Sequence, residues 1–376
     1  MLENMLISKF MGVGPENIIQ IDKSLTKRPG DQMTFRIIPP LSNSGGGDDS
    51  DIEGNEESLN AFNFPITIHE RNNGVRSAGI MTDKRTAINI RREATVALGN
   101  WAAEQVENDL IYALSGLGNQ NTYAGEGTSD IETVNEKAPS TNRIFYGGQT
   151  VAGVVTSESS DSALGDGGAA DYANYLFGTK IIDIAKRKAQ MASPKFGPIM
   201  INGKGYYVMF IHPLQTKGLQ AETSAVNSWS AIQAAANVRG INNPLFGKQG
   251  AGRDRIFDGA VGVWNDVILY ELDRIQTRVA GEVFDNGDTI DTNVASGTAR
   301  VARALLCGAQ AGVIGWGKNW KRHEKDFDYG RKPGTAIDGI YGASKTRFND
   351  PGADQNTNTA QEDFAVIAVD TCVAED

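Results

Sequence analysis

The sequence predicts an α+β protein in which a long β-hairpin and one unusually long helix are followed by a larger region of mixed strands and helices. Three observations support this class. Two segments near the start alternate apolar and polar residues, which is typical of strands buried on one face only. Residues 83–117 repeat apolar side chains at helical spacing. The rest of the chain joins short apolar segments of both kinds through glycine-rich loops.

The first elements are an arm and a hairpin. Residues 1–30 are expected to form an N-terminal arm, because a short apolar piece is followed by turn signals. The hairpin strands are the alternating segments QMTFRII at 32–38 and FNFPITIH at 62–69. Between them, positions 48–57 contain six acidic residues. These like charges repel one another, which favours an extended and solvated tip.

The long helix is predicted over residues 83–117. Thr82 or Asp83 can serve as its N-cap, the segment contains no proline, and Gly116 and Gly118 stand at its end. At 1.5 Å per residue the helix would be about 50 Å long, roughly three times the usual length. A lone helix of this length needs an equally long surface to lie against.

The remaining elements are shorter. Residues 119–168 are rich in Gly, Ser and Asp and are expected to form loops. The elements expected after them are a helix at 171–191, a strand at 199–211 with a turn at Asn202-Gly203, a helix at 228–238, a strand at 260–271, an apolar helix at 298–313 and a final strand at 363–372.

Composition excludes several classes of protein. A hydrophobic content of 40% and a charged content of 22% fit a soluble globular protein of 376 residues. The net charge of −10 argues against a protein whose main task is to grip nucleic acid. No apolar run approaches the roughly 20 residues of a membrane span, so no membrane partner is expected. Cys307 and Cys372 lie far apart and are expected to be free thiols in a reducing compartment.

The sequence contains no recognisable catalytic motif. The three histidines are too scattered for a zinc pattern, and the acidic tip lacks the residue order of an EF-hand. There is no phosphate-binding loop and no nucleophile elbow. The one cluster of note is His323, Glu324 and Asp326 in HEKDFDYG, which is more typical of a polar loop with salt bridges. We therefore expect no catalytic, cofactor-binding or metal site.

Specific strings along the chain resemble a known family. They are KFMG at 9–12, PGDQMTFRI at 29–37, EGNEE at 53–57, GIMTDKRT at 79–86, GNWAAEQVENDL at 99–110, FIHP at 210–213, NNPLFG at 242–247 and EKDFDYG at 324–330. In this order, and over nearly the whole chain, they resemble the tailed-phage major capsid proteins with the Hong Kong ninety-seven type fold. The similarity is greatest to the branch found in podoviruses like phage N-four.

The resemblance implies a division of the chain. Residues 1–30 would be the N-arm, 31–82 the E-loop hairpin and 83–211 the P-domain, with its spine helix at 83–117 and its second helix at 171–191. Residues 212–330 would be the A-domain at the capsomer centre, and 331–376 would return to the P-domain. The implied protein is a shell subunit that forms pentamers and hexamers of an icosahedral head around double-stranded DNA.

The resemblance also implies partners and contacts. We expect assembly in the host cytoplasm with portal and scaffolding proteins and with a decoration or cement protein, a final place in the virion capsid, and only non-specific contact with the packaged DNA. A neighbouring subunit would bury the apolar face of the hairpin, and the tip acids would meet basic residues near the start of a neighbour's spine helix. The residues expected to make these intersubunit contacts are Phe62, Phe64, Ile66, Ile68, Glu53, Glu56, Glu57, Arg85, Arg91 and Arg92.

Three alternatives stay open at this point. An encapsulin-like nanocompartment shell has the same fold, and a cargo enzyme encoded beside it would distinguish it from a phage head. A hydrolase would need titratable groups that converge in a cleft, for which only the 323–328 cluster is available. A secreted or surface adhesin is disfavoured because the first residues lack the basic and apolar regions of an export signal.

Overall fold

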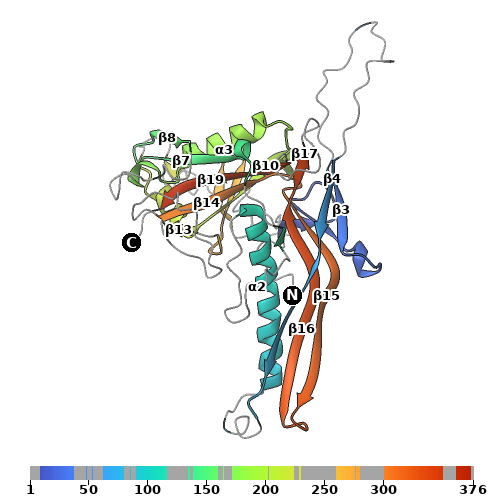
Figure 1. Ribbon diagram of the computed structural model, residues 1–376. Coiled ribbons are helices and arrows are strands. Elements are labelled where there is room, and N and C mark those ends of the chain that lie inside the picture. Colours follow the sequence, from blue (N-terminus) through green and yellow to red (C-terminus); the bar gives the residue numbers. More distant parts are fainter. Residues whose placement is uncertain are drawn as a thin grey trace.

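The computed structural model consists of a broad head and a long, narrow arm that extends from it (Figure 1). It describes residues 9–37, 62–79, 90–116, 134–135, 139–159, 172–201, 203–223, 228–229, 260–275, 277–279, 300–349 and 361–373, together with the single residues 48, 53, 85 and 164. Among these residues, no helix combines the length and the apolar character that crossing a bilayer requires.

The arm is one helix lying along a sheet. Helix α2 (Ile90–Ser115) runs beside the hairpin of β15 (Gly312–Phe327) and β16 (Lys332–Lys345), and β5 (His69–Arg76) pairs antiparallel with β16 at the sheet edge (Figure 1). On the other side of β15 lie the short strands β2 (Ile19–Asp22) and β1 (Met11–Gly12). The β15–β16 hairpin thus supplies the long surface that the helix was expected to need.

The sequence of α2 explains how it packs. A buried residue recurs at every fourth position, which places one apolar stripe toward the sheet. The buried residues of this stripe are Ala94, Leu98, Ala102, Val106 and Leu110. Gly116, with φ of +63°, ends the helix and donates its N–H to the Tyr112 carbonyl, as the sequence predicted. The helix was predicted to begin at residue 83. Of residues 83–89 the structure describes only Arg85, which is helical, and the other six lie outside the described residues.

The predicted hairpin is present, but its apolar face is covered differently from what was expected. Strand β3 (Gln32–Ile37) pairs with β4 (Phe62–Thr67) in the register that places Phe35 opposite Phe64. Their apolar side chains are buried in the core of the same chain, over the face of the arm sheet that α2 does not cover. At Gly315, a Cβ would lie 2.4 Å from the sulfur of Met33 and 3.0 Å from Cδ1 of Ile66, so a larger residue would force these two hairpin side chains to shift.

In the described part of the chain, nine strands form the sheet of the head. Its main path has the order β11-β12-β10-β14-β19-β7-β8, with β9 and β13 paired beside it. The bounds are β7 Ile144–Gln149, β8 Val155–Glu158, β9 Ile199–Ile201, β10 Lys204–Ile211, β11 Ala260–Trp264, β12 Val267–Glu271, β13 Thr277–Val279, β14 Arg300–Cys307 and β19 Val366–Val373. Helix α3 (Thr179–Met191) crosses one face, and α2 ends against the other (Figure 1).

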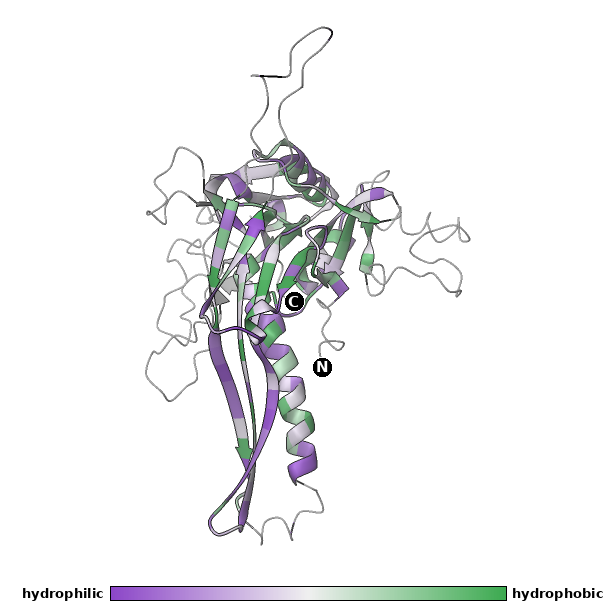
Figure 2. Ribbon diagram, turned by 90° about the vertical axis from the view of Figure 1, so that its right-hand side faces the viewer, coloured by the Kyte–Doolittle hydropathy of each residue, from purple (hydrophilic) through white to green (hydrophobic). Residues whose placement is uncertain are grey.

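Smaller elements connect these parts. Helix α4 (Pro213–Gln220) follows β10, and strand β6 (Val134–Asn135) pairs with β16. Strand β17 (Arg347–Asn349) pairs with β18 (Gln361–Asp363) where the chain passes from arm to head. Figure 2 shows that hydrophobic residues gather in the strands of the head, that α2 carries hydrophobic and hydrophilic patches, and that the far strands of the arm are largely hydrophilic.

Several predicted elements are confirmed and others are wrong. The strand at 199–211 turns back on itself between β9 and β10, with Gly203 at φ of +79°, and the final strand is β19. The helix expected at 171–191 begins only at Thr179. The strand expected at 260–271 is a pair of strands with a turn at Asn265 and Asp266. The helix expected at 228–238 lies almost wholly outside the described residues.

The helix expected at 298–313 is the clearest error, because this segment forms β14 and the start of β15. Seven of the eight residues of β14 are buried, since the strand lies at the centre of the sheet and both of its faces are covered. Such a strand reads as a continuous apolar run, and its periodicity cannot be told from that of a buried helix.

The expected division of the chain into domains stays a prediction, and the sheets of the structure do not follow its boundaries. The boundary at residue 330 falls in the turn of the β15–β16 hairpin, whose two strands are paired along their length. The sheet of the head takes strands from each of the segments 83–211, 212–330 and 331–376. The physical units are therefore the arm and the head, and each is assembled from segments far apart in sequence.

Candidate functional site

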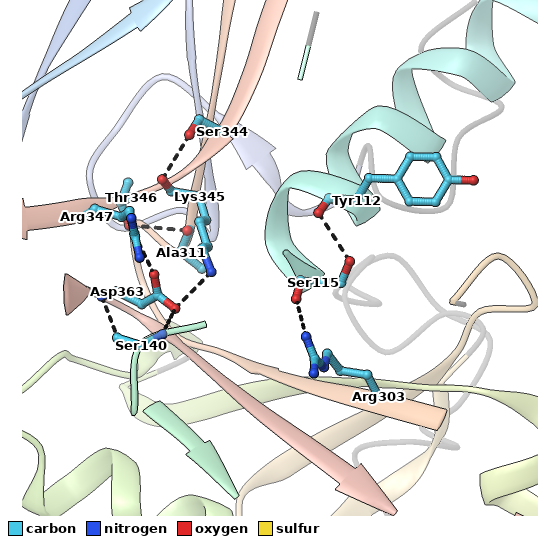
Figure 3. A network of polar contacts seen from close by, with 10 residues as sticks. All are labelled: Tyr112, Ser115, Ser140, Arg303, Ala311, Ser344, Lys345, Thr346, Arg347 and Asp363. Atoms are coloured by element: carbon cyan, nitrogen blue, oxygen red, sulfur yellow. Dashed lines mark hydrogen bonds and ion pairs between the residues drawn. The ribbon is translucent and has the colours of Figure 1, made fainter. Parts of the chain in front are cut away.

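A buried cation joins the arm to the head. Arg303 of β14 makes a two-pronged ion pair with Asp370 of β19, with nitrogen–oxygen distances of 2.7 and 2.6 Å. Its third contact is the carbonyl of Ser115, which accepts a hydrogen bond of 2.9 Å from Nη1 (Figure 3). Ser115 is the last residue of α2, where a positive charge is favoured by the helix dipole. The orientation of the long helix is thereby fixed to the central strands of the head.

A second buried cluster holds the passage from β16 into the head. Lys345 Nζ and Arg347 Nε each donate to Asp363, at 2.9 Å, and the Ser140 backbone N–H donates to the same carboxylate at 3.1 Å (Figure 3). The side chains of Lys345 and Asp363 are 0% and 1% exposed. Burial lowers the pKa of Lys345 to about 8, although Asp363 acts in the opposite direction.

A third polar cluster ties α2 to the arm sheet. Arg71 of β5 donates to Asp109 at 2.6 Å and to Gln105 at 2.7 Å, both on α2. The Tyr341 hydroxyl of β16 donates to the same Asp109 carboxylate at 2.5 Å. Burial, and then the Asp109 charge, raise the pKa of Tyr341 well above its ordinary value. These three clusters tie the long helix to the arm sheet and the arm to the head, which leaves the surface of the subunit for contacts with other molecules.

The expected contact residues at the start of α2 are only partly available to a neighbour. Arg91 lies 2.5 Å from Asp326 and 3.9 Å from Glu324, both on β15 of the same chain. Arg85 and Arg92 are exposed. The two acids that pair with Arg91 belong to the string EKDFDYG, so the structure assigns them to an intrachain contact that sequence spacing did not reveal.

The expected contact residues of the hairpin are mostly inside the subunit. Phe62 is half-buried, whereas Phe64, Ile66 and Ile68 are buried within the chain. The apolar face of the hairpin is therefore covered by residues of its own chain and is not left for a neighbouring subunit to bury. Glu53 is exposed, and Glu56 and Glu57 lie outside the described residues.

The cluster considered for hydrolysis does not converge. His323 lies 2.6 Å from Asp338, while Glu324 and Asp326 point to the opposite face of β15, toward Arg91 of α2. A hydrogen bond from Lys318, followed by that from His323, holds the pKa of Asp338 below its ordinary value. The described residues contain no group of three side chains placed to hold a metal ion.

Sequence reasoning missed a groove on the arm. A hollow of about 470 Å³ lies over β5, β15 and β16, and Gly74, Gly334 and Ala336 are among its lining residues. Phe327 packs against Gly334, where a Cβ would lie 2.8 Å from its ring. The cations of Arg76 and Lys325 lie 5.5 and 5.2 Å from the centre of the same ring. In the sequence, the signal for this groove was that small and basic residues lie close together in each strand. The groove itself forms only because the strands pair.

The known proteins that this chain resembles are phage capsid proteins. A family model described as phage capsid protein matches residues 1–375. The major capsid protein of Pseudomonas phage KPP25 is 26% identical over 371 residues, which cover 96% of this chain and 89% of that protein. The capsid of Ralstonia phage GP4 has a similar fold, with a TM-score of 0.72 and 24% identity over 98% of this chain and 90% of that chain. The capsid of cyanophage Pam1 is also similar in fold, with a TM-score of 0.66 and 20% identity over 100% of this chain and 94% of that chain.

Proposed function

Since the chain belongs to the phage capsid protein family, we propose that it is the major shell subunit of a phage head. The supporting observation is that the likeness to capsid chains runs through the arm and the head alike. The family is one of structural proteins and not of enzymes, and the chain has its place in the virion capsid as part of a shell of many copies. The phage head is thereby favoured over the nanocompartment and the hydrolase.

The finer assembly is part of the proposal. Copies of the chain form pentamers and hexamers of an icosahedral shell of the Hong Kong ninety-seven type, with residues 212–330 of each subunit toward the capsomer centre. The ordered strings of the sequence favour the branch of podoviruses like phage N-four. Portal, scaffolding and decoration proteins would join the shell, which would assemble in the host cytoplasm around double-stranded DNA that it contains without recognising its sequence.

The contacts between neighbouring subunits are proposed on electrostatic grounds. The acidic tip of one hairpin, with Glu53, Glu56 and Glu57, lies against the exposed Arg85 and Arg92 of a neighbour's long helix. Arg91 contributes less than expected, because Asp326 and Glu324 already neutralise it within its own chain. The hairpin residues Phe62, Phe64, Ile66 and Ile68 support this contact by holding the hairpin in place on the arm.

The test is the particle mass and shape of the purified chain, measured by light scattering and negative-stain electron microscopy, alone and with a candidate scaffolding protein. We expect closed shells, or pentamers and hexamers that convert to them. A chain that stays a monomer or dimer under every condition would refute the proposal.

A further inference from the structure

A second hollow, of about 370 Å³, lies in the head between the end of α3 and the short turn that precedes β7. Three cations line it: Arg143 from the turn, and Arg187 and Lys188 from the helix. Among the described residues that line this hollow there is no carboxylate. This hollow is not part of the three buried polar clusters or of the proposed contacts between subunits.

Arg143 is the unusual member of the three. Its side chain is 2% exposed, and its Nη2 donates to the Pro194 carbonyl at 3.1 Å. Its Nε and Nη1 are buried and have no hydrogen-bond partner in the described part of the chain. Burial lowers the pKa of Arg143, with the nearby charges of Glu362 and Asp363 acting in the opposite direction. A buried guanidinium with unused donors is costly, and an anion would offset that cost.

The nearest carboxylates are already engaged. Asp363 accepts hydrogen bonds from Lys345 and Arg347, and Glu362 accepts one of 2.7 Å from Asn142. Lys188 is held in place by its own hydrogen bond of 3.0 Å to the Ile144 carbonyl, and burial lowers its pKa. The neighbourhood therefore holds more positive than negative charge, even after its acids are counted.

We propose that this hollow is a binding pocket for a phosphate group. A phosphate carries a charge of about −1.5 to −2 at neutral pH and several acceptor oxygens, which suits two guanidinium forks and one ammonium that converge from two elements. The volume lies within the range of small-molecule sites, and Met191, 78% exposed, offers an apolar wall for the group that bears the phosphate. The group comes either from a free phosphate compound or from the backbone of nucleic acid.

Because of where the pocket lies, phosphate binding would depend on its three cationic side chains. It lies at the carboxyl end of α3, where the helix dipole disfavours an anion. Attraction must therefore come from the side chains alone, and loss of a single cation should weaken binding strongly. Arg187 is the residue to change, because it is exposed and its removal leaves the fold intact.

The first experiment is calorimetric titration of the full chain with inorganic phosphate, with chloride at equal ionic strength as reference. We expect saturable phosphate binding that weakens at least tenfold in Arg187→Ala. Arg331→Ala removes an exposed arginine in the turn at the far end of the arm and serves as the matched control, with binding unchanged. The conservative variant Arg187→Lys should restore part of the affinity, and thermal unfolding of each variant checks that it is folded.

A second titration, with a short DNA duplex followed by fluorescence anisotropy at several salt concentrations, separates the two sources. If nucleic acid supplies the phosphate, Arg187→Ala weakens duplex binding and lowers its salt dependence by about one counterion. If a free compound supplies it, only binding of inorganic phosphate changes. The proposal is overturned if the wild-type chain binds neither, or if Arg187→Ala and Arg331→Ala behave alike in both titrations.

Discussion

At the scale of single residues, Asp363 is the carboxylate on which two buried cations depend, because Lys345 and Arg347 both donate to it. Replacing it, as in Asp363→Ala, would leave both charges buried without their counterion. Breaking a buried ion pair in this way costs about 3–5 kcal/mol of the free energy of unfolding. Urea denaturation of the unassembled chain should detect this loss.

The matched control for this change is Asp326→Ala, which removes a carboxylate whose ion pair with Arg91 is about half exposed on both sides. Such surface pairs contribute less than about 1 kcal/mol. Similar losses of stability in the two variants would show that the buried cluster is not the support we take it to be.

Lys345 also makes stability depend on pH. Burial lowers its pKa from the ordinary 10.5 to about 8 in the folded chain. Between these values the unfolded chain holds a proton that the folded chain has released, so the contribution of this group to stability rises with pH. Since each pKa unit corresponds to about 1.36 kcal/mol, the free energy of unfolding is expected to rise by roughly 3 kcal/mol across this range.

The measurement is the free energy of unfolding of the wild type and of Lys345→Met from pH 7.5 to 10.5. The variant cancels the titration of all other groups, so the difference between the two proteins isolates this lysine. We expect the wild type to gain relative to the variant across the range. A difference that does not change with pH would show that Lys345 keeps an ordinary pKa.

At the scale of elements, β4 lies very close to the backbone of the arm sheet beneath it. A Cβ added at Gly342 of β16 would lie 2.2 Å from the backbone oxygen of Thr67, which no side-chain rotation can relieve. Gly342→Ala should therefore lift the hairpin and cost about 1–3 kcal/mol, as overpacking does. Limited proteolysis should cut the variant sooner within the hairpin. Gly197→Ala, which meets nothing within 4 Å, is the control and should differ from the wild type by less than about 0.5 kcal/mol.

The two faces of the hairpin lead to opposite predictions for an added charge. Ile66→Asp places a carboxylate at a position that is 1% exposed, so we expect an unstable or unfolded subunit. Thr34→Asp adds the same charge to the exposed face of β3, and the chain should fold normally. Thermal unfolding distinguishes the two variants. If Ile66→Asp folded as well as Thr34→Asp, the apolar face would not be packed within its own chain.

The elements that could be predicted are those whose signals are local. The alternation of the hairpin, the four-residue spacing of α2 and the Asn202-Gly203 turn each lie within a short window. The strand β14 could not be recognised, because burial on both faces removes the alternation that marks a strand. The cover of the hairpin could not be predicted either, because Gly315 and Gly342 lie more than two hundred residues further along the chain.

The candidate contact surface stays a prediction. Arg85, Arg92 and the acidic tip were chosen from their charges alone, and both arginines are exposed. The neutralisation of Arg91 could not be predicted, since Glu324 and Asp326 reach it only because a distant hairpin lies along the long helix. For the same reason, the sequence left His323, Glu324 and Asp326 as the one cluster available to the hydrolase alternative and favoured a polar loop with salt bridges. In the structure they lie on a strand, where alternate side chains point to opposite faces.

At the scale of the whole molecule, the arm is fixed to the head, so we expect surface charge to control how fast subunits associate. Under the proposed contact, the tip acids steer a neighbour into register, and such steering acts on the association rate more than on the final affinity. The triple variant Glu53→Gln, Glu56→Gln, Glu57→Gln should therefore assemble more slowly than the wild type, as followed by light scattering. Shells that do form should have the same size.

Salt provides the internal check on this prediction. Raising the salt from about 50 to about 300 mM shortens the screening length and should slow the wild type, whereas the triple variant should be slow at both concentrations. The control removes three exposed acids elsewhere, in Glu16→Gln, Glu271→Gln and Asp273→Asn, and changes the net charge by the same amount. It should keep the rate and the salt dependence of the wild type. If the control and the tip variant slowed equally, net charge and not the position of the tip acids would govern assembly.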